Sequence, residues 1–271
     1  MKNFHLLQKN NLWFGSFPLL ENNGFVNGCS CRLNGVSDVA AGTLNLALHV
    51  GDNPQLVVEN RQSFAEALGV DAAKFTTCQQ VHGSKVVRVT EELIGSGAVS
   101  FENTVADTDS LICNIPDVPL MLFYADCVPM LLADNVSGAV GLAHAGWRGT
   151  VAKIAQKTLD AMAEEFGTKA ENVVAAIGPS IGRCCYEVDD FVRNQAAGYE
   201  EFFAPKELAG KYMLDLWGYN VKQLLEYGVL SENIAVAEVC TAHNSSLFCS
   251  YRAEKGNTGR MGVCLMARKY R

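Results

Sequence analysis

Short apolar runs separated by turn-forming residues mark the middle of the chain. The runs are Leu120–Ala125, Met130–Ala133 and Ala139–Ala145. Runs of this length bounded by Pro, Gly, Asn and Asp are typical of buried strands. The pattern therefore predicts three strands, with Cys127 at a strand edge beside Pro129 and His144 at the end of the third strand.

Apolar residues spaced three or four positions apart predict helices elsewhere. In the first of these helices, Asp52 or Asn53 fits the N-cap, Pro54 fits the first turn, and Arg61 is expected as a solvent-facing charge. The other helices are predicted over Val151–Phe166 with Thr150 as N-cap and Gly167 as stop, over Asp189–Glu201, and over Leu214–Tyr227 with Asp215 as N-cap and Gly228 as stop.

Further strands are predicted where β-branched and aromatic residues gather between turns. They are an edge strand within residues 1–20, Phe25–Arg32, a hairpin over Phe75–Thr90 that turns at His82–Ser84, Asn172–Ile177, Asn233–Cys240, Leu247–Arg252 and Arg260–Arg268. No repeat, low-complexity linker or break in composition divides the chain. We therefore expect an α+β fold in a single domain over residues 1–271, with mixed β-sheets flanked by helices.

Composition narrows the class of protein. The chain is 49% hydrophobic and 19% charged, with a net charge of −7, so a sequence-general nucleic-acid surface is not expected. The N-terminus lacks the apolar segment of a secretory signal, and no apolar run approaches the roughly 18 residues of a membrane span. Ten cysteines without an export signal indicate mostly free thiols in a reducing compartment. We expect a cytoplasmic protein that binds neither nucleic acid nor membrane.

Candidate metal ligands stand at three turn-like positions that we expect to be exposed: His82, Cys127 and His144. Catalytic zinc sites usually take three protein ligands and leave the fourth position for water or substrate, and two imidazoles with one thiolate suit Zn²⁺. The same residues permit another interpretation, in which Cys127 is a nucleophile and His144 its base. The adjacent Asp126 would then orient the base or raise the pKa of the thiol.

Several other chemistry-bearing residues have structural interpretations. Asp107 and Asp109 would share one strand face if their segment is extended, where they could bind a cation or simply cap a turn. His49 is expected to be a structural histidine. Two cysteine pairs lack metal partners at matching spacing or would form a strained disulfide, so free thiols are expected at Cys29, Cys31, Cys184 and Cys185.

Six segments of the chain resemble the signature blocks of the YfiH family, whose members are also called laccase domain-containing proteins or multicopper polyphenol oxidases. The segments are QQVHGSKVV, ADTDSLI, ADCVPMLLAD, GLAHAGWRGTVAKI, IGPSIGRCCYEV and CTAHNSSLFCSYRAEKGNTGRMG. They run from about Cys31 to Met266, and the combination of ADC with AHAGWRG is specific. One departure is Asn34, where members often have Gly, which affects the expected loop geometry near Ser37.

The resemblance implies an activity and a set of site residues. Members are described as purine nucleoside phosphorylases acting on adenosine, inosine, guanosine and S-methyl-5'-thioadenosine, with adenosine deaminase activity alongside. The implied metal ligands, and so the catalytic residues, are His82, Cys127 and His144, with Zn²⁺ as the usual metal and Cu²⁺ also reported. Because it offers a cation beside a helix start, Arg148 is the leading candidate for a phosphate contact. Lesser candidates for ligand contacts are Asn45, Arg61, Gln80, Arg252 and His243.

Three alternatives stay open on the sequence. A multicopper oxidase needs more imidazoles than the five histidines supply, although a single copper could occupy the same three ligands. A thiol hydrolase or amidase on cell-wall intermediates would use Cys127 and His144. A metal-dependent binding module would use the same ligands without turnover. A monomer and a small homo-oligomer are both compatible with the sequence.

Overall fold

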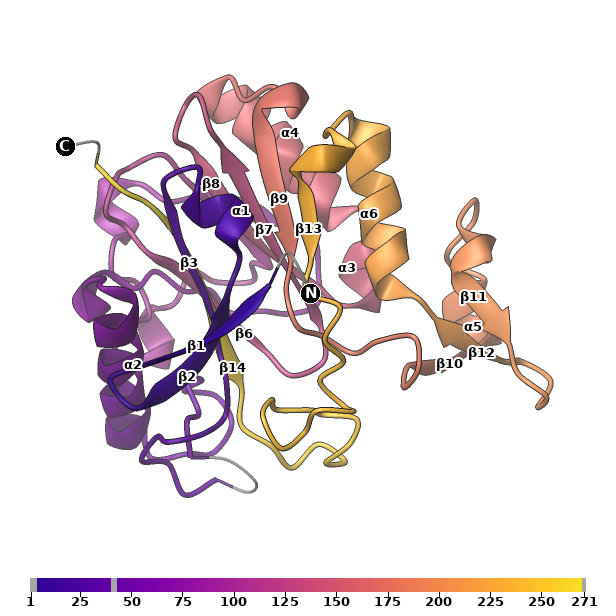
Figure 1. Cartoon of the computed structure of the whole chain (residues 1–271), viewed down its shortest axis with the longest axis horizontal. Coiled ribbons are helices and arrows are strands. Elements are labelled where there is room, and N and C mark those ends of the chain that lie inside the picture. The colour runs from indigo at the N-terminus through magenta and orange to yellow at the C-terminus, as the bar shows by residue number, and fades with distance from the viewer. Residues whose placement is uncertain (1–3, 40–42, 270–271) are drawn as a thin grey trace.

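Two large β-sheets face each other in the computed structural model, and helices cover their outer faces (Figure 1). The structure describes residues 4–39 and 43–269. Within these ranges the helices are α1 (Pro18–Glu21), α2 (Pro54–Leu68), α3 (Trp147–Val151), α4 (Ile154–Phe166), α5 (Asp190–Arg193) and α6 (Leu216–Tyr227). The architecture confirms the α+β class that the sequence predicts.

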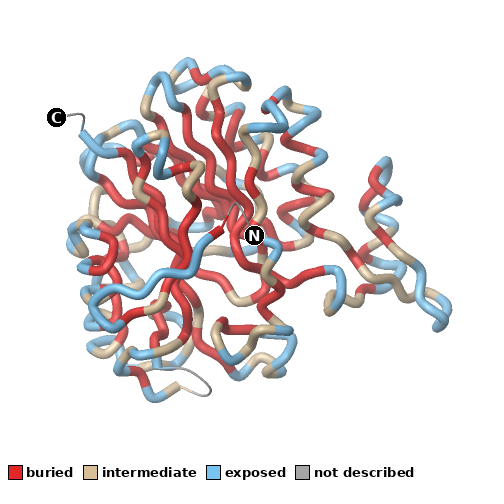
Figure 2. Tube along the Cα trace, viewed as in Figure 1, coloured by how far each residue is buried: buried red, intermediate tan, exposed pale blue. Residues whose placement is uncertain are grey.

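The first sheet has five antiparallel strands in the order β1-β2-β3-β14-β6. Its strands are β1 (His5–Lys9), β2 (Leu12–Ser16), β3 (Phe25–Ser30), β14 (Met261–Ala267) and β6 (Leu120–Tyr124). The N-terminal strand β1 is exposed along its length, whereas the strands behind it are mostly buried (Figure 2). An exposed edge of this kind is what the sequence predicts for the first residues, of which residues 1–3 lie outside the described ranges.

The second sheet is mixed, with six strands in the order β13-β9-β7-β8-β5-β4. Its strands are β13 (Ile234–Val236), β9 (Val173–Ile177), β7 (Val128–Asp134), β8 (Val140–Ala145), β5 (Ser110–Cys113) and β4 (Val86–Arg88). The outer pairs β13·β9 and β4·β5 are parallel, and the inner pairs are antiparallel. A third, small sheet is formed by β10 (Glu187–Asp189), β12 (Lys211–Leu214) and β11 (Phe203–Pro205).

Alternation of side chains along the strands builds three buried layers. In β6, Leu122 and Tyr124 point into the core between the two large sheets, whereas Met121 and Phe123 pack under α2. In β7, Leu131 faces the core between the sheets, and its neighbours face the layer under α4 and α6. The chain passes from the first sheet to the second at the turn between β6 and β7, which is where Cys127 lies.

The helix caps follow the sequence signals closely. The Asn53 side chain accepts a hydrogen bond from the Gln55 N–H at the start of α2, and Asp215 does the same for Gly218 at the start of α6. Gly167 and Gly228 end α4 and α6 in the left-handed conformation. The prediction of Thr150 as an N-cap is wrong, because Thr150 lies inside α3, whose N-cap is Gly146.

Three predicted elements differ from the structure. The segment Phe75–Thr90 is not a hairpin, since β4 pairs in parallel with β5 and the residues before His82 run alongside other segments. Leu247–Arg252 forms turns instead of a strand, although Phe248 and Cys249 are buried in the core between the sheets. Asp189–Glu201 is helical only at α5 and at a short 3-10 turn, Glu200–Phe202.

Local backbone geometry resolves two further expectations. Asn34 adopts a positive φ of 64°, a conformation that suits glycine and that Asn tolerates better than most other residues. Ser37 nearby is buried and donates to the Asp52 carboxylate at 2.5 Å. A side-chain hydrogen bond therefore holds Ser37, three residues after Asn34.

The ten cysteines are all free thiols, as their composition predicts. Cys29 and Cys31 are buried in the core between the sheets and belong to neither cluster of potential metal ligands found among the described residues. No helix in the described part of the chain is long and apolar enough to cross a membrane.

Candidate metal centre and pocket

Three side chains that are distant in sequence converge at one point between the sheets. His82 comes from the loop before β4, Cys127 from the turn between β6 and β7, and His144 from the end of β8. One ligand atom from each lies within 4.8 Å of the other two. His82 is exposed and Cys127 half-buried, but His144 is only 3% exposed, so the expectation that all three would be exposed is wrong for His144.

Asp109 fixes two of these three residues. Its Oδ1 atom lies 2.8 Å from His144 Nδ1, and its two oxygens accept the N–H groups of Val81, His82 and Gly83 at 2.7 to 3.2 Å. Burial raises the pKa of Asp109, but these bonds outweigh it and hold the pKa below its usual value. The carboxylate therefore leaves His144 Nε2 as the free ring nitrogen and ties the His82 loop to β5.

This role of Asp109 differs from the one expected from the sequence. Asp107 has a positive φ of 47° and is exposed, while Asp109 is fully buried, so the two do not share a strand face. Asp126 does not orient His144 either. Its carboxylate instead accepts the Thr241 hydroxyl at 2.7 Å and the Arg252 N–H at 2.6 Å.

The local electrostatics favour a thiolate next to an imidazolium when no metal is bound. Burial raises the pKa of Cys127, but the neighbouring His144 and His82 outweigh it and lower the pKa to about 6. Burial lowers the pKa of His144, but Cys127 and Asp109 raise it to about 9. A site that stabilises a thiolate is already prepared for a thiophilic cation, which replaces the proton of the imidazolium.

The donor set fits a zinc or copper ion with an open coordination position. A Cβ atom added to Gly146 would lie 3.0 Å from Cys127 Sγ and 3.4 Å from the His82 ring, so only glycine leaves the space beside these donors free. The carboxylate behind His144 supplies the outer support that metal-bound histidines usually have. Three protein donors, one of them anionic, match the catalytic class of zinc sites.

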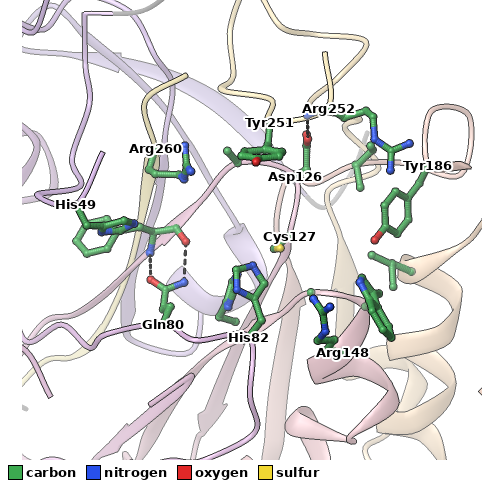
Figure 3. A pocket seen from close by; sticks show the side chains of 17 residues that line it. His49, Gln80, His82, Asp126, Cys127, Arg148, Tyr186, Tyr251, Arg252 and Arg260 are labelled. Atoms are coloured by element: carbon green, nitrogen blue, oxygen red, sulfur yellow. Dashed lines mark hydrogen bonds between the residues drawn. The ribbon is translucent and has the colours of Figure 1, made fainter. Parts of the chain in front are cut away.

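The three donors lie in the wall of a pocket of about 530 Å³, within the range of small-ligand sites (Figure 3). The other residues that line it are His49, Gln80, Phe123, Ala125, Asp126, Gly146, Trp147, Arg148, Ile181, Tyr186, Leu216, Tyr251, Arg252 and Arg260. Figure 3 shows Cys127 and His82 at the centre, with His49 and Gln80 on one side and Arg148 and Tyr186 on the other. The pocket therefore combines a cluster of potential metal ligands, aromatic surfaces and cations.

Three arginines give the pocket an anion-binding character. Arg148 is exposed, with its guanidinium carbon 4.5 Å from the centre of the Trp147 ring. Arg252 donates to the Glu187 carbonyl, and Arg260 donates to the Thr258 and Gly259 carbonyls. Within the described residues, the Arg148 guanidinium donates no hydrogen bond. Of these three arginines, Arg148 therefore has the most N–H donors available for a ligand.

The other predicted contact residues occupy different places. Gln80 lines the pocket and exchanges two hydrogen bonds of 2.8 Å with the Phe123 backbone, so its amide is already paired. Asn45 and Arg61 do not line the pocket. Asn45 accepts the Arg260 N–H at 2.9 Å and thereby positions that arginine from behind. Arg61 is 2% exposed and donates to the backbone carbonyls of Leu46, Gly97 and Ala98, so the expectation of a solvated charge is wrong.

Three lining residues that could contact a ligand, His49, Tyr186 and Arg260, were not predicted as site residues from the sequence. His49, expected to be structural, is exposed at the pocket rim with its ring 6.1 Å from Phe123. Although part of its side chain is exposed, partial desolvation by the surrounding protein atoms, followed by the charges of Arg260 and Arg61, lowers the pKa of His49 to about 4, which keeps it neutral near pH 7. The guanidinium carbon of Arg252 lies 5.2 Å from the centre of the Tyr186 ring. The only sequence signal for Tyr186 and Arg260 is that both lie in segments that resemble the family.

His243, a predicted ligand contact, lies outside the pocket lining. Its Nδ1 atom is 3.3 Å from Cys184 Sγ.

Comparison with known proteins adds a family context to this geometry. A family model described as multi-copper polyphenol oxidoreductase laccase matches residues 26–268. The chain is 36% identical over 244 residues to a Bacillus subtilis protein named purine nucleoside phosphorylase YlmD, covering 89% of this chain and 88% of that one. It is 39% identical over 242 residues to the Geobacillus stearothermophilus protein of the same name, covering 88% of each.

Solved structures give the same picture. The crystal structure of YlmD from Geobacillus stearothermophilus superposes with a TM-score of 0.91 at 35% identity, covering 97% of this chain and 99% of that one. That of the Bacillus licheniformis hypothetical protein YfiH gives a TM-score of 0.90 at 33% identity, covering 94% and 96%. Both the sequence and the fold are therefore shared over nearly the whole chain.

Proposed function

This chain belongs to the laccase-domain family that includes YlmD and YfiH, and from that membership we propose that it is a zinc-dependent purine nucleoside phosphorylase. The observation that carries the proposal is the placement of a three-donor metal centre in a pocket that also holds three arginines. A nucleoside and a phosphate are the substrates that such a pocket suits, because one is aromatic and the other anionic.

His82, Cys127 and His144 would hold the metal, with Asp109 behind His144. When bound, Zn²⁺ supplies Lewis-acid polarisation of an oxygen and lowers the pKa of a bound water. Cu²⁺ would compete for the same donors. The family name refers to copper oxidases, but the described residues form only two clusters of Cys and His donors, and these contain three imidazoles in total. That supply is too small for a mononuclear centre together with a trinuclear one.

Phosphorolysis requires phosphate to reach C1′ of the ribose while the purine departs. Arg148 would bind phosphate through free guanidinium donors, and Arg252 and Arg260 would add positive potential from the opposite wall. Phe123 and the neutral His49 offer flat surfaces for the purine. This division places the anion beside Arg148 and the base toward His49, with the ribose between them.

We propose adenosine, inosine, guanosine and S-methyl-5'-thioadenosine as nucleoside substrates, and adenosine deamination as a second activity. The pocket volume of about 530 Å³ accommodates a purine nucleoside and phosphate together.

A thiol hydrolase is the second candidate, and one observation favours it. Cys127, His144 and Asp109 follow the order of nucleophile, base and orienting carboxylate, and the pKa of Cys127 is lowered to about 6. The two candidates differ in their need for metal. Activity that survives strong chelation but is lost on alkylation would favour the hydrolase.

The direct test is to incubate zinc-loaded protein with inosine or adenosine, with and without inorganic phosphate. We expect ribose 1-phosphate and free base that depend on both phosphate and zinc. Arg148→Gln should raise the KM for phosphate by about tenfold or more, since a charge-assisted hydrogen bond contributes about 1.5–3 kcal/mol. Arg88→Gln is the matched control, because Arg88 is exposed and pairs with Glu165 away from the pocket. Absence of ribose 1-phosphate under all these conditions would refute the proposal.

A further inference from the structure

A second group of sulfur and nitrogen donors lies outside the metal centre described above. Cys184, Cys185, Cys240 and His243 each place one ligand atom within 4.8 Å of the other three. They share no residue with the first centre. We propose that these four side chains bind one zinc ion in a structural site that fixes one wall of the pocket.

The spacing of the donors is close to that of a tetrahedral zinc site. Cys184 Sγ lies 3.3 Å from His243 Nδ1. A sulfur and a nitrogen bound to the same zinc at ~2.3 and ~2.0 Å would lie about 3.5 Å apart at a tetrahedral angle. A small rearrangement of surface side chains would therefore complete the coordination.

The backbone brings the two donor segments together before any metal binds. Ser180 forms a parallel bridge with Cys240, and the Thr241 N–H donates to the Ser180 carbonyl at 3.0 Å. The Cys185 N–H donates to the Gly182 carbonyl, which folds the first segment into a tight turn. The four donors are thus held by main-chain bonds, and not by side-chain packing alone.

The burial of the four donors is compatible with entry of a cation from solvent. The Gly182 N–H donates to Cys240 Sγ at 3.2 Å. Because Cys184 and His243 are exposed and Cys240 is buried, an ion can enter from solvent and reach the innermost sulfur. Zinc would displace the thiol protons of the three cysteines on binding.

Four protein donors leave no position for a substrate, which is the mark of a structural zinc site. The site would nonetheless affect the pocket, since Ile181 and Tyr186 in the same turn line it. The Ile181 N–H donates to the Asp126 carbonyl at 2.9 Å, and Thr241 donates to the Asp126 side chain. Asp126 directly precedes Cys127, so the two clusters are connected through one residue.

The test is to count zinc in protein that has been reduced, saturated with Zn²⁺ alone and desalted. We expect about two zinc ions per chain in the unmodified protein and about one in the double variant Cys184→Ser/His243→Ala. Cys127→Ala should also hold about one, which identifies the remaining ion with the second site. His5→Ala is the matched control, because His5 is another exposed histidine and should leave the count unchanged.

Two further measurements do not depend on nucleoside turnover. With Co²⁺ in place of zinc, the double variant should lose most of the thiolate-to-metal charge-transfer absorption, since the second site has three sulfurs and the first has one. In the unmodified protein, zinc should protect Cys184 from alkylation. One zinc per chain, alkylation of Cys184 unaffected by zinc, or a disulfide among these cysteines in zinc-saturated protein would overturn the proposal. None of these results would bear on the phosphorylase.

Discussion

The protein contains two clusters of cysteine and histidine that differ in what stands behind the donors. In the first cluster, His144 is buried in a strand, and its Nδ1 atom lies against the carboxylate of Asp109. In the second, His243 is exposed, and its Nδ1 atom lies against the sulfur of Cys184. The first cluster offers three donors beside a pocket, and the second offers four at the surface.

Under the two proposals, this difference would assign chemistry to one cluster and structural support to the other, with the same residue types in both. A missing fourth donor leaves room for a reacting group, and a buried carboxylate sets the tautomer and the basicity of the ligand. A complete set of donors on loops instead connects segments and excludes substrate. The position in the fold follows the same logic, because the first cluster lies where the chain crosses between the two large sheets and the second lies on the loops beyond them.

The largest expected effect separates the two clusters by turnover. Cys127→Ala should lower kcat/KM for nucleoside phosphorolysis by about 10³-fold or more, because the metal supplies several kcal/mol of transition-state stabilisation. Cys113→Ala is the control, since Cys113 is buried in β5 and belongs to neither cluster. Steady-state kinetics with zinc in excess measures both. Turnover within tenfold of the unmodified protein in Cys127→Ala would place the chemistry elsewhere.

A smaller effect should follow from the carboxylate that only the first cluster has. Asp109→Asn should weaken zinc binding at the first site by about 10- to 100-fold, because the amide cannot accept all the bonds that now orient His144 and the His82 loop. Competition with a chromophoric chelator measures the affinity. Asp107→Asn is the matched control, as Asp107 is exposed two residues away. Equal affinities in the two variants would show that Asp109 does not support the metal.

Local patterns predicted those parts of the fold that depend on local burial. The apolar runs at β6, β7 and β8 were correctly predicted as strands, because each is buried on both faces between two layers. The predicted hairpin at Phe75–Thr90 is wrong because β4 pairs with β5, a strand more than twenty residues further along the chain. That pairing depends on tertiary contacts. The predicted strand at Leu247–Arg252 is wrong because this segment folds into turns. Its apolar residues are buried there without pairing to a strand.

The candidate site divides in the same way. Residue type and turn-like position grouped His82, Cys127 and His144 as candidate metal ligands, and the resemblance to a family then implied the same set. Their convergence, and the choice of Asp109 over Asp126 as the supporting carboxylate, depend on how β5 pairs with β8. The burial of Arg61 could not be predicted from the sequence either. Its guanidinium donates to three backbone carbonyls that are distant from it along the chain, and only the folded structure brings them together.

The two clusters should also differ in thiol reactivity when no metal is bound. Thiolate forms as pH rises, so alkylation of Cys127 should increase through pH 6 and then level off, following its lowered pKa. The pKa of Cys184 is raised, first by desolvation, so its alkylation should still be rising above pH 9. At pH 7 we expect Cys127 to react at least about fivefold faster, although Cys184 is more exposed.

Peptide mapping by mass spectrometry after timed alkylation of the zinc-free protein measures both rates. Faster modification of Cys184 at pH 7 would mean that exposure, and not the neighbouring imidazoles, controls the reactivity. Adding zinc should slow the modification of Cys127, because a metal-bound thiolate is a poorer nucleophile.

The smallest expected effect comes from a matched pair of glycines, one beside each cluster. A Cβ at Gly146 would lie 3.0 Å from Cys127 Sγ, and one at Gly182 would lie 3.3 Å from Cys184 Sγ and 2.9 Å from the Trp217 ring. Gly146→Ala should therefore weaken zinc binding only at the first site, and Gly182→Ala only at the second, each by a few-fold, since such crowding costs about 1 kcal/mol or more. Zinc titration of each variant in the Cys127→Ala background or in the Cys184→Ser/His243→Ala background isolates one site at a time. A change at both sites in either variant would show that the connection through Asp126 couples the two clusters more strongly than their separate donor sets suggest.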